Sequence, residues 1–264
     1  MLDTRHSTAI LATFVVGTLS MGVNVAEATF HFMQIEQVMG GVNGDVSAQA
    51  IQLRMRAAGQ HLVLQARLRA WDAAGANPIT LIDIAADLTG PSVAGDRILI
   101  ATAGFASKTT PTAVPDFIMS AIPPSYLAAG SLTFEDDLGI IYWRVSWGGA
   151  AYTGSTLGDT TNDDDPGLGP ANFGPPFAGP LPSARCLALQ FQGTAAALSI
   201  SNNTDYAVTS DAAVWAKYHG ASYTISLCIP AVSQWGLVVM MLTLLAAATL
   251  LIARRRGVVL ADPA

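Results

Sequence analysis

The residues with the clearest capacity for chemistry are acidic residues in a segment rich in turn formers. Asp159, Asp163 and Asp165 lie in a stretch from 156 to 182 that is dense in Asp, Asn, Gly and Pro. Closely spaced oxygens suit Ca²⁺, which takes about six to eight oxygen ligands in flexible geometry. The stretch lacks the central glycine and terminal glutamate of an EF-hand loop. These three aspartates are the calcium candidates, and the simpler alternative is a solvated acidic turn that opens a proline-rich surface loop.

The two cysteines, Cys186 and Cys228, are the next candidate pair. In an exported chain a disulfide can form and persist, so we expect these residues to pair. A loop of about 40 residues closed in this way stabilises a fold by about 4 kcal/mol in the chain-entropy model. Two separately buried thiols are the alternative.

Catalytic patterns are absent from the sequence. The histidines outside the first 28 residues are His31, His61 and His219, and neither a Gly-x-Ser-x-Gly elbow nor a His-Glu-x-x-His pair occurs. A carboxylate pair for glycoside hydrolysis can be drawn from the many acids in too many ways to be informative. We therefore expect no enzymatic activity and no cofactor beyond the calcium candidate. The alternative is a secreted hydrolase with a cryptic acid pair or metal site.

Aromatic residues cluster in one predicted strand and the turn after it. A period of two places Trp143, Val145 and Trp147 on one face, and Tyr142 and Arg144 on the other. Aromatic faces at a strand end can stack on sugar rings, but this alternation favours packing of both tryptophans in a core.

The elements that must position these residues are short strands. Runs with alternating, β-branched or aromatic residues, separated by Gly, Asn and Pro turns, predict strands at 32–39, 50–56, 61–71, 79–84, 97–102, 139–147, 186–191 and 222–227. Short helical turns are expected within 115–129 and 211–218, and Glu135, Asp136 and Asp137 are expected at a hairpin tip. Many short strands with frequent turns predict a mostly β chain that forms an antiparallel β-sandwich.

The C-terminal region has a different composition. Gly236 to Ala253 is a run of 18 uncharged residues, followed by Arg254, Arg255 and Arg256. As a helix rising about 1.5 Å per residue, the run nearly matches a bilayer core of about 30 Å. Inside it, Thr243 can return its hydroxyl to the helix backbone. We therefore predict a transmembrane helix at 237–253 and a short basic tail at 254–264, with the three arginines as a topology anchor that stays on the cytoplasmic side.

This tail resembles the IPTL-CTERM family of bacterial C-terminal sorting signals, in which a short motif precedes one hydrophobic helix and a basic cluster. Ile229, Pro230, Trp235 and Gly236 match the motif, whereas Ala231 and Val232 stand where Thr and Leu are usual. The resemblance covers about 28 residues. It implies a sorting motif at 229–236 and an exosortase-type processing enzyme as a partner. Such an enzyme would remove the helix and release the domain towards the cell surface.

The N-terminal residues indicate export. Arg5 and His6 precede an apolar, small-residue stretch, and Ala26-Glu27-Ala28 supplies the small residues that a signal peptidase accepts. Residues 1–28 are therefore predicted to be a signal peptide, and a retained N-terminal anchor is the alternative.

The predicted domain at 29–228 is also faintly similar to the lamin-tail domain, an immunoglobulin-like β-sandwich. The similar residues are Ile35 to Val38, Gly44-Asp45, Ile51 to Leu53 and Gly95 to Ile100. Gln52 stands where that family usually has Glu, and the Asn-Pro-Gly turn expected after it is missing. The resemblance implies an immunoglobulin-like fold and no particular function.

Charge and composition limit the partners. The net charge is −6, and Lys108 and Lys217 are the only lysines in the sequence, so nucleic acid is not an expected partner. The sequence predicts an exported, non-catalytic protein of the bacterial cell envelope or extracellular matrix, with a role in adhesion or polysaccharide contact. It would pass through the inner membrane and reach the cell surface. A permanently membrane-tethered binding module is a further alternative.

Overall fold

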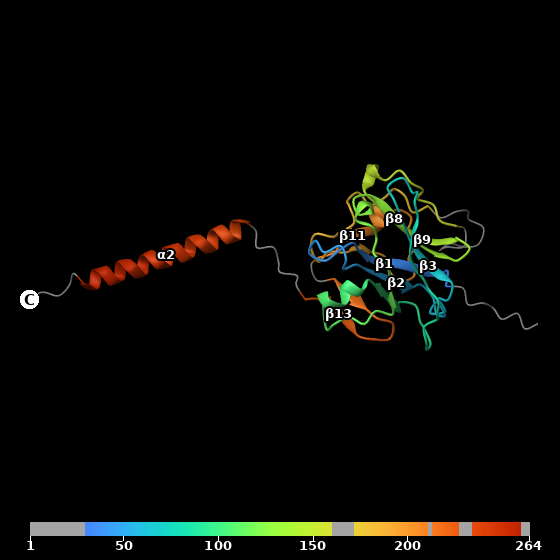
Figure 1. The fold of residues 1–264 in the computed structure, drawn as a ribbon, viewed down its shortest axis with the longest axis horizontal. Helices are drawn as coiled ribbons and strands as arrows, with labels where there is room; N and C mark the ends of the chain where they lie inside the picture. The colour runs from blue at the N-terminus through green and yellow to red at the C-terminus, as the bar shows by residue number, and fades with distance from the viewer. Residues whose placement is uncertain (1–29, 160–171, 211–212, 227–233, 260–264) are drawn as a thin grey trace, which may run out of the picture.

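The computed structural model describes residues 30–159, 172–210, 213–226 and 234–259, and its architecture is mostly β (Figure 1). This confirms the predicted class. The strands are β1 (Met33–Met39), β2 (Ala50–Met55), β3 (Ala66–Trp71), β4 (Ile79–Asp83), β5 (Arg97–Ala101), β6 (Thr109–Thr110), β7 (Phe117–Ile118), β8 (Gly130–Asp136), β9 (Ile141–Trp147), β10 (Leu189–Phe191), β11 (Tyr206–Val208), β12 (Val214–Ala216) and β13 (Ser222–Ile225). The helices are α1 (Asn202–Asp205), α2 (Gln234–Val259) and the 3-10 turns η1 (Ala103–Lys108), η2 (Pro124–Tyr126) and η3 (Gly149–Ala151).

Two sheets enclose the main core. One has the order β11-β10-β1-β2-β5-β7 and the other β4-β3-β8-β9, and all pairs are antiparallel except β5 with β7. Apolar side chains from both sheets form one buried cluster, in which Ile35, Leu53 and Ile98 of the larger sheet join Phe134 and Trp143 of the smaller one. This arrangement is consistent with a β-sandwich, in which the inner faces of two sheets pack together.

A bulge in β1 interrupts its alternation. The pairing of β1 with β2 shifts register between Ile35 and Gln37. As a result Ile35 and Val38, three positions apart, both pack in the main core. Glu36 and Gln37 are left together on the opposite face, where both bond to groups outside that core. A bulge has this effect because one extra residue changes which face each following side chain occupies.

A third, three-stranded sheet with the order β12-β13-β6 packs on that opposite face. Its Trp215 and Ile225 form a second buried cluster with Leu99 and Ala101 of β5 and Phe105 of η1. The larger sheet is therefore covered on both faces, and the polar residues near its middle lie between covering elements.

Several predicted elements differ from the structure. The strand predicted at 61–71 begins only at Ala66, because Gln65 has a φ of 71° that breaks the extended backbone. β8 lies centrally in its sheet and was not predicted. Residues 214–216 form strand β12 instead of a helical turn, and 115–129 holds β7 as well as the short turn η2.

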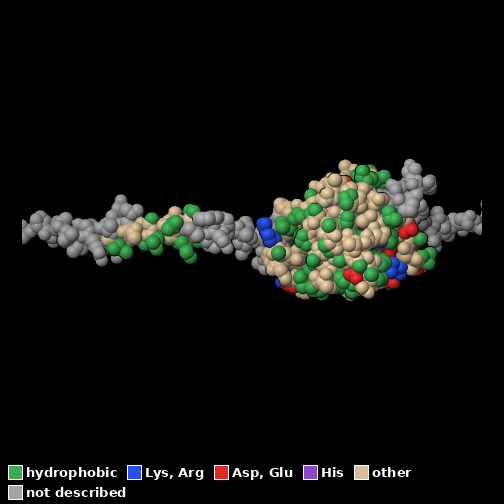
Figure 2. Space-filling view, turned by 90° about the horizontal axis from the view of Figure 1, so that it is seen from above, with side chains coloured by type: hydrophobic (Ala, Val, Ile, Leu, Met, Phe, Trp, Pro, Cys, Tyr) green, Lys and Arg blue, Asp and Glu red, His purple; other side chains and the backbone are tan. Residues whose placement is uncertain are grey.

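Helix α2 is 26 residues long. Its described side chains from Val239 to Thr249 are all exposed, and in Figure 2 hydrophobic side chains predominate along it. As the sequence predicted, Thr243 donates its hydroxyl to its own helix, at 2.8 Å from the Met240 carbonyl oxygen. Thr249, which the prediction overlooked, does the same to Ala246 at 2.8 Å. Within the parts of the chain that the structure describes, no helix combines the length and apolar character needed to cross a membrane.

Candidate functional site

The most concentrated polar chemistry lies on the face of the larger sheet that turns away from the main core. Glu36 is at its centre, with a side chain only 2% exposed. Its carboxylate accepts hydrogen bonds from Arg97 Nε at 2.6 Å and Arg97 Nη2 at 2.8 Å, and from Gln52 Nε2 at 2.7 Å. Arg54 Nη1 lies 2.9 Å from its Oε1. One buried carboxylate is thus shared by two guanidinium groups, which leaves an excess of one positive charge.

The two arginines differ in how fully they are engaged. Arg54 also donates from Nε to Gln34 Oε1 and from Nη2 to the Gly193 carbonyl at 2.6 Å. Burial lowers the pKa of Arg54, whereas the hydrogen bond to Glu36 raises the pKa of Arg97. The Arg97 side chain is 40% exposed, and its Nη1 makes no hydrogen bond within the described residues. Arg97 is therefore the cation of this cluster that can reach a ligand.

Two glutamines hold strand β12 against this face. Gln37 and Gln52 are cross-strand partners on β1 and β2. Gln37 Nε2 donates to the Val214 carbonyl at 3.0 Å, and Gln52 Oε1 accepts from the Ala216 amide at 2.6 Å. These two side-chain amides therefore form hydrogen bonds with two backbone groups of β12 that do not take part in its pairing with β13.

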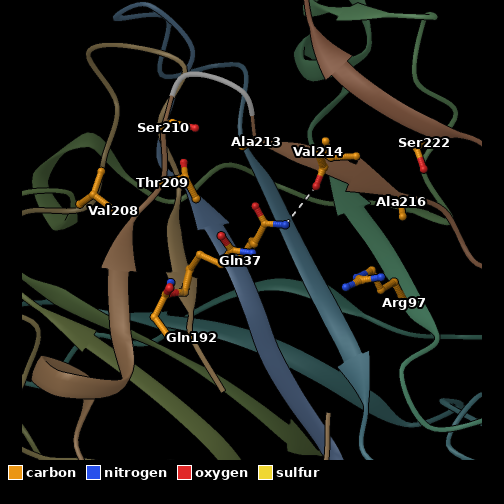
Figure 3. Close-up of a pocket in the computed structure, with 11 residues that line it drawn as sticks. Gln37, Arg97, Gln192, Val208, Thr209, Ser210, Ala213, Val214, Ala216 and Ser222 are labelled. Atoms are coloured by element: carbon orange, nitrogen blue, oxygen red, sulfur yellow. Dashed lines mark hydrogen bonds between the residues drawn. The ribbon is translucent and has the colours of Figure 1, made fainter. Parts of the chain in front are cut away.

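Between these elements lies a cavity of about 560 Å³, shown in Figure 3. Its size falls within the range of about 300 to 1,000 Å³ that is usual for small-molecule sites. The lining is largely polar and comprises Gln37, Arg97, Gln190, Gln192, Val208, Thr209, Ser210, Ala213, Val214, Ala216 and Ser222. Asp211 and Ala212 lie outside the described residues. The described lining contains one cation and no carboxylate.

One lining residue, Gln37, has a side-chain atom with an unmet hydrogen-bonding requirement. Gln37 is 3% exposed, and its Oε1 has no hydrogen-bond partner within the described residues. The amide cannot be turned over, because the Val214 carbonyl needs the donor Nε2 opposite it. Figure 3 shows this bond between the two residues, which come from β1 and β12. A buried carbonyl oxygen without a donor costs about 1 to 3 kcal/mol, so this acceptor favours a bound molecule that supplies one.

A second ion cluster lies on the smaller sheet and explains the acidic run near 136. Glu135 is buried, and it accepts hydrogen bonds from Arg67 Nε at 2.8 Å and Arg69 Nη2 at 2.9 Å. Asp136, the last residue of β8, instead accepts the Ile140 amide hydrogen at 2.8 Å across the turn to β9. The predicted hairpin is therefore present, but Glu135 and Asp136 belong to strand β8 and not to the tip.

One serine lies close to a histidine, a contact that the sequence did not reveal. His61 Nδ1 is 2.9 Å from Ser92 Oγ, which also accepts the Gly59 amide hydrogen at 2.8 Å. Within the described residues no carboxylate bonds to this imidazole, as the orienting acid of a catalytic triad would. The observed contacts tie the Gly59–His61 turn to Ser92.

Of the calcium candidates, only Asp159 lies within the described residues. Its Oδ2 accepts the Ile141 amide hydrogen at 2.6 Å, and its own amide donates to the Ile141 carbonyl at 2.9 Å. Asp159 therefore fastens the chain to the start of β9. Asp163 and Asp165 lie outside the described residues. Among the residues that are described, no group of three or more His, Cys, Asp or Glu is placed to hold a metal ion.

The cysteine prediction concerns one described and one undescribed residue. Cys186 is 1% exposed, belongs to the second core and takes part in a disulfide bond. Cys228, the only other cysteine in the sequence, lies outside the described residues. The pairing of these two residues stays a prediction.

The aromatic cluster of β9 serves the core. Trp143 and Trp147 are fully buried in the main cluster, as the alternation predicted. Tyr142 was expected on the other face, but it also packs there, edge-on to Phe30 at a centroid distance of 5.7 Å. Trp143 Nε1 donates to the Tyr206 hydroxyl at 2.8 Å, and that hydroxyl donates to the Ile35 carbonyl at 2.5 Å. Neither tryptophan is available for stacking on a sugar.

The structure describes only some of the residues of the predicted sorting motif. Ile229 and Pro230 lie outside the described residues. Trp235 and Gly236 lie in the first turn of α2, and Arg254, Arg255 and Arg256 lie in its last turns. Only the backbone is described at these five positions, so their roles stay predictions.

Comparison with known proteins finds no family model and no curated protein that matches this chain. The cavity beside Gln37 and Arg97 was not predicted from the sequence. Its glutamines Gln37 and Gln190, which lie on strands β1 and β10, were the available signal.

Proposed function

We propose that this protein is an exported, non-catalytic binding protein of the bacterial cell envelope, delivered by its C-terminal segment and acting in adhesion or polysaccharide contact. In this proposal the β domain is an immunoglobulin-like sandwich, preceded by a cleaved signal peptide at 1–28. The helix at 237–253 spans the inner membrane until an exosortase-type enzyme removes it.

The observation that carries this proposal is helix α2, which exposes apolar side chains throughout its described length. Met241 is 68% exposed and Leu245 is 67% exposed, and both threonine hydroxyls bond within the helix. Exposed apolar surface of this extent is unfavourable in water and is typical of a segment that contacts lipid or a partner. Because side chains at both ends of α2 are not described, the proposed span rests on the uncharged run in the sequence.

A disulfide supports export. Disulfide bonds persist in oxidising compartments and are rare in the cytosol, so the bonded Cys186 fits a domain outside the inner membrane. The cavity on the larger sheet supports a binding role, because its lining offers polar groups around an unsatisfied acceptor.

The test follows the tail in bacterial cells that contain an exosortase. We expect the wild-type chain to lose α2, as shown by mass spectrometry of the surface fraction. A variant carrying Pro230→Ala and Trp235→Ala should remain full length in the membrane. Ser233→Ala, which changes a residue between the matched positions, is the control and should be processed normally. A wild-type chain that stays full length would contradict processing and favour the permanently tethered module.

A further inference from the structure

We propose that the cavity beside Gln37 and Arg97 binds an acidic saccharide segment, with a sugar hydroxyl on Gln37 Oε1 and a carboxylate on Arg97. This inference deepens the polysaccharide contact in the proposed function by naming the binding residues and the class of sugar.

The first argument concerns the donor that Gln37 requires. Its Nε2 is committed to the Val214 carbonyl at 3.0 Å, and its Oε1 is a buried acceptor that has no donor within the described residues, so a sugar hydroxyl that reaches it supplies the missing bond. A sugar hydroxyl can donate to this oxygen and, through its own oxygen, accept from a neighbouring group. Thr209 offers such a group at the cavity wall, because its Oγ1 already accepts the Ala188 amide at 2.9 Å and its hydrogen remains to be donated.

The second argument concerns charge. The cluster of Glu36, Arg54 and Arg97 carries one excess positive charge, and Arg97 brings it to the cavity. Its Nε and Nη2 are taken by Glu36, whereas Nη1 has no partner within the described residues. A carboxylate bonded there would complete the neutralisation of the cluster, and charge-assisted bonds are roughly twice as strong as neutral ones. The described lining has no acid to repel it.

The third argument concerns the shape and the remaining walls. Ala213, Val214 and Ala216 supply small apolar surface beside the polar groups. A sugar ring presents C–H groups on its faces and hydroxyls at its edges, which matches this division. A cavity of about 560 Å³ also has room for water, so the experiment must separate a sugar from solvent.

The experiment uses the full chain, purified in a zwitterionic detergent so that no sugar headgroup competes for the site. Trigalacturonic acid and its methyl ester are titrated separately by isothermal calorimetry. The two probes share their hydroxyls and differ in charge. We expect the acid to bind and the ester to bind about tenfold more weakly, which corresponds to about 1.4 kcal/mol.

Variants locate the binding. Gln37→Met removes the acceptor, and Arg97→Gln removes the charge, and each should weaken binding of the acid by about tenfold or more. Arg67→Gln is the matched control, because Arg67 also pairs with a buried glutamate but lies on the other sheet. It should bind like the wild type. Should the first two variants fold poorly, Ser222→Trp fills the cavity from an exposed position, and its melting temperature serves as the check on folding.

Three results would overturn the inference: no heat with either probe at millimolar concentration, equal binding of acid and ester, or full binding by Ser222→Trp and Arg97→Gln. Failure of the proposed function has a different readout. A chain that binds trigalacturonic acid but stays unprocessed in the cell refutes sorting and leaves the site intact, whereas a surface-delivered chain that binds no sugar refutes only the site.

Discussion

Arg97 forms two hydrogen bonds to the Glu36 carboxylate, from Nε to Oε2 at 2.6 Å and from Nη2 to Oε1 at 2.8 Å. Their strands are not adjacent, because β2 lies between β1 and β5 in the sheet. The ion pair therefore reaches across a whole strand, and Gln52 on that strand bonds to the same carboxylate at 2.7 Å. Three neighbouring strands are thus joined on the face that also lines the cavity.

Removing the negative charge of the Glu36 carboxylate should destabilise the domain. Glu36→Gln keeps the shape but leaves the buried Arg54 without its counter-ion, and breaking a buried pair typically costs about 3 to 5 kcal/mol. Urea denaturation followed by tryptophan fluorescence gives the free energy of unfolding. Asp83→Asn, which removes a charge from an exposed site, is the control and should change it by less than about 0.5 kcal/mol. If Glu36→Gln lowered the free energy of unfolding by less than about 1 kcal/mol, the arginines would have to be stabilised by water in place of the carboxylate.

The hydroxyl of Tyr206 should be as important to the main core as its ring. Tyr206→Phe leaves Trp143 Nε1 without its acceptor and the Ile35 carbonyl without this donor. We expect a loss of about 2 kcal/mol, since a buried polar group left unpaired costs about 1 to 3 kcal/mol. Tyr223→Phe is the matched control, because that tyrosine is also buried and its hydroxyl has no hydrogen bond within the described residues. Equal losses in the two variants would remove the special role of Tyr206.

The sequence predicted some strands of the fold accurately and missed others, and the differences have physical causes. β2 and β5 were placed within one residue, and these two strands pair with each other without a register shift. β8 was not predicted, because a charged residue such as Glu135 near the end of the strand is more typical of a loop. The guanidinium groups of Arg67 and Arg69, on the neighbouring strand β3, pair with this charge inside the sheet.

The cavity could not be predicted from the sequence either, because the residues that form it are far apart in the chain. Its central contact joins Gln37 to Val214, which are 177 positions apart. The bulge that turns Gln37 onto the same face as Glu36 has no signature in the local pattern of apolar and polar residues. In β9, the period of two correctly placed Trp143 and Trp147 in the main core, but it misplaced Tyr142, which packs in the same cluster.

Acid should weaken the loop around Asp45. Hydrogen bonds from Lys108 and then from Ser47 lower the pKa of Asp45 from 3.8 to about 2. Because the folded-state pKa is the lower one, the stabilisation is present above pH 4 and is lost as the pH falls towards about 2. Melting temperatures of the wild type and Asp45→Asn should therefore differ at pH 5 and converge near pH 2. A constant difference across this range would mean that the carboxylate's charge is not involved.

The disulfide should account for both cysteines of the chain. Before reduction, alkylation under denaturing conditions should add no mass, and after reduction it should modify Cys186 and Cys228 together. Replacing both by alanine should lower the free energy of unfolding by up to about 4 kcal/mol, because the open chain gains entropy when unfolded. Two free thiols in the oxidised, exported protein would contradict the predicted pairing.

A single charge in the middle of α2 should test membrane insertion directly. Leu245 lies near the centre of the uncharged run from Gly236 to Ala253 and is exposed. An arginine at the centre of a spanning helix costs about 2.5 to 3.5 kcal/mol on insertion scales, so Leu245→Arg should move the chain from the membrane to the soluble fraction after carbonate extraction. Leu260→Arg makes the same change beyond the arginine cluster and should stay in the membrane. If Leu245→Arg also remained there at the wild-type level, α2 would not be held by lipid along its centre, and a protein partner for its apolar surface would have to be sought instead.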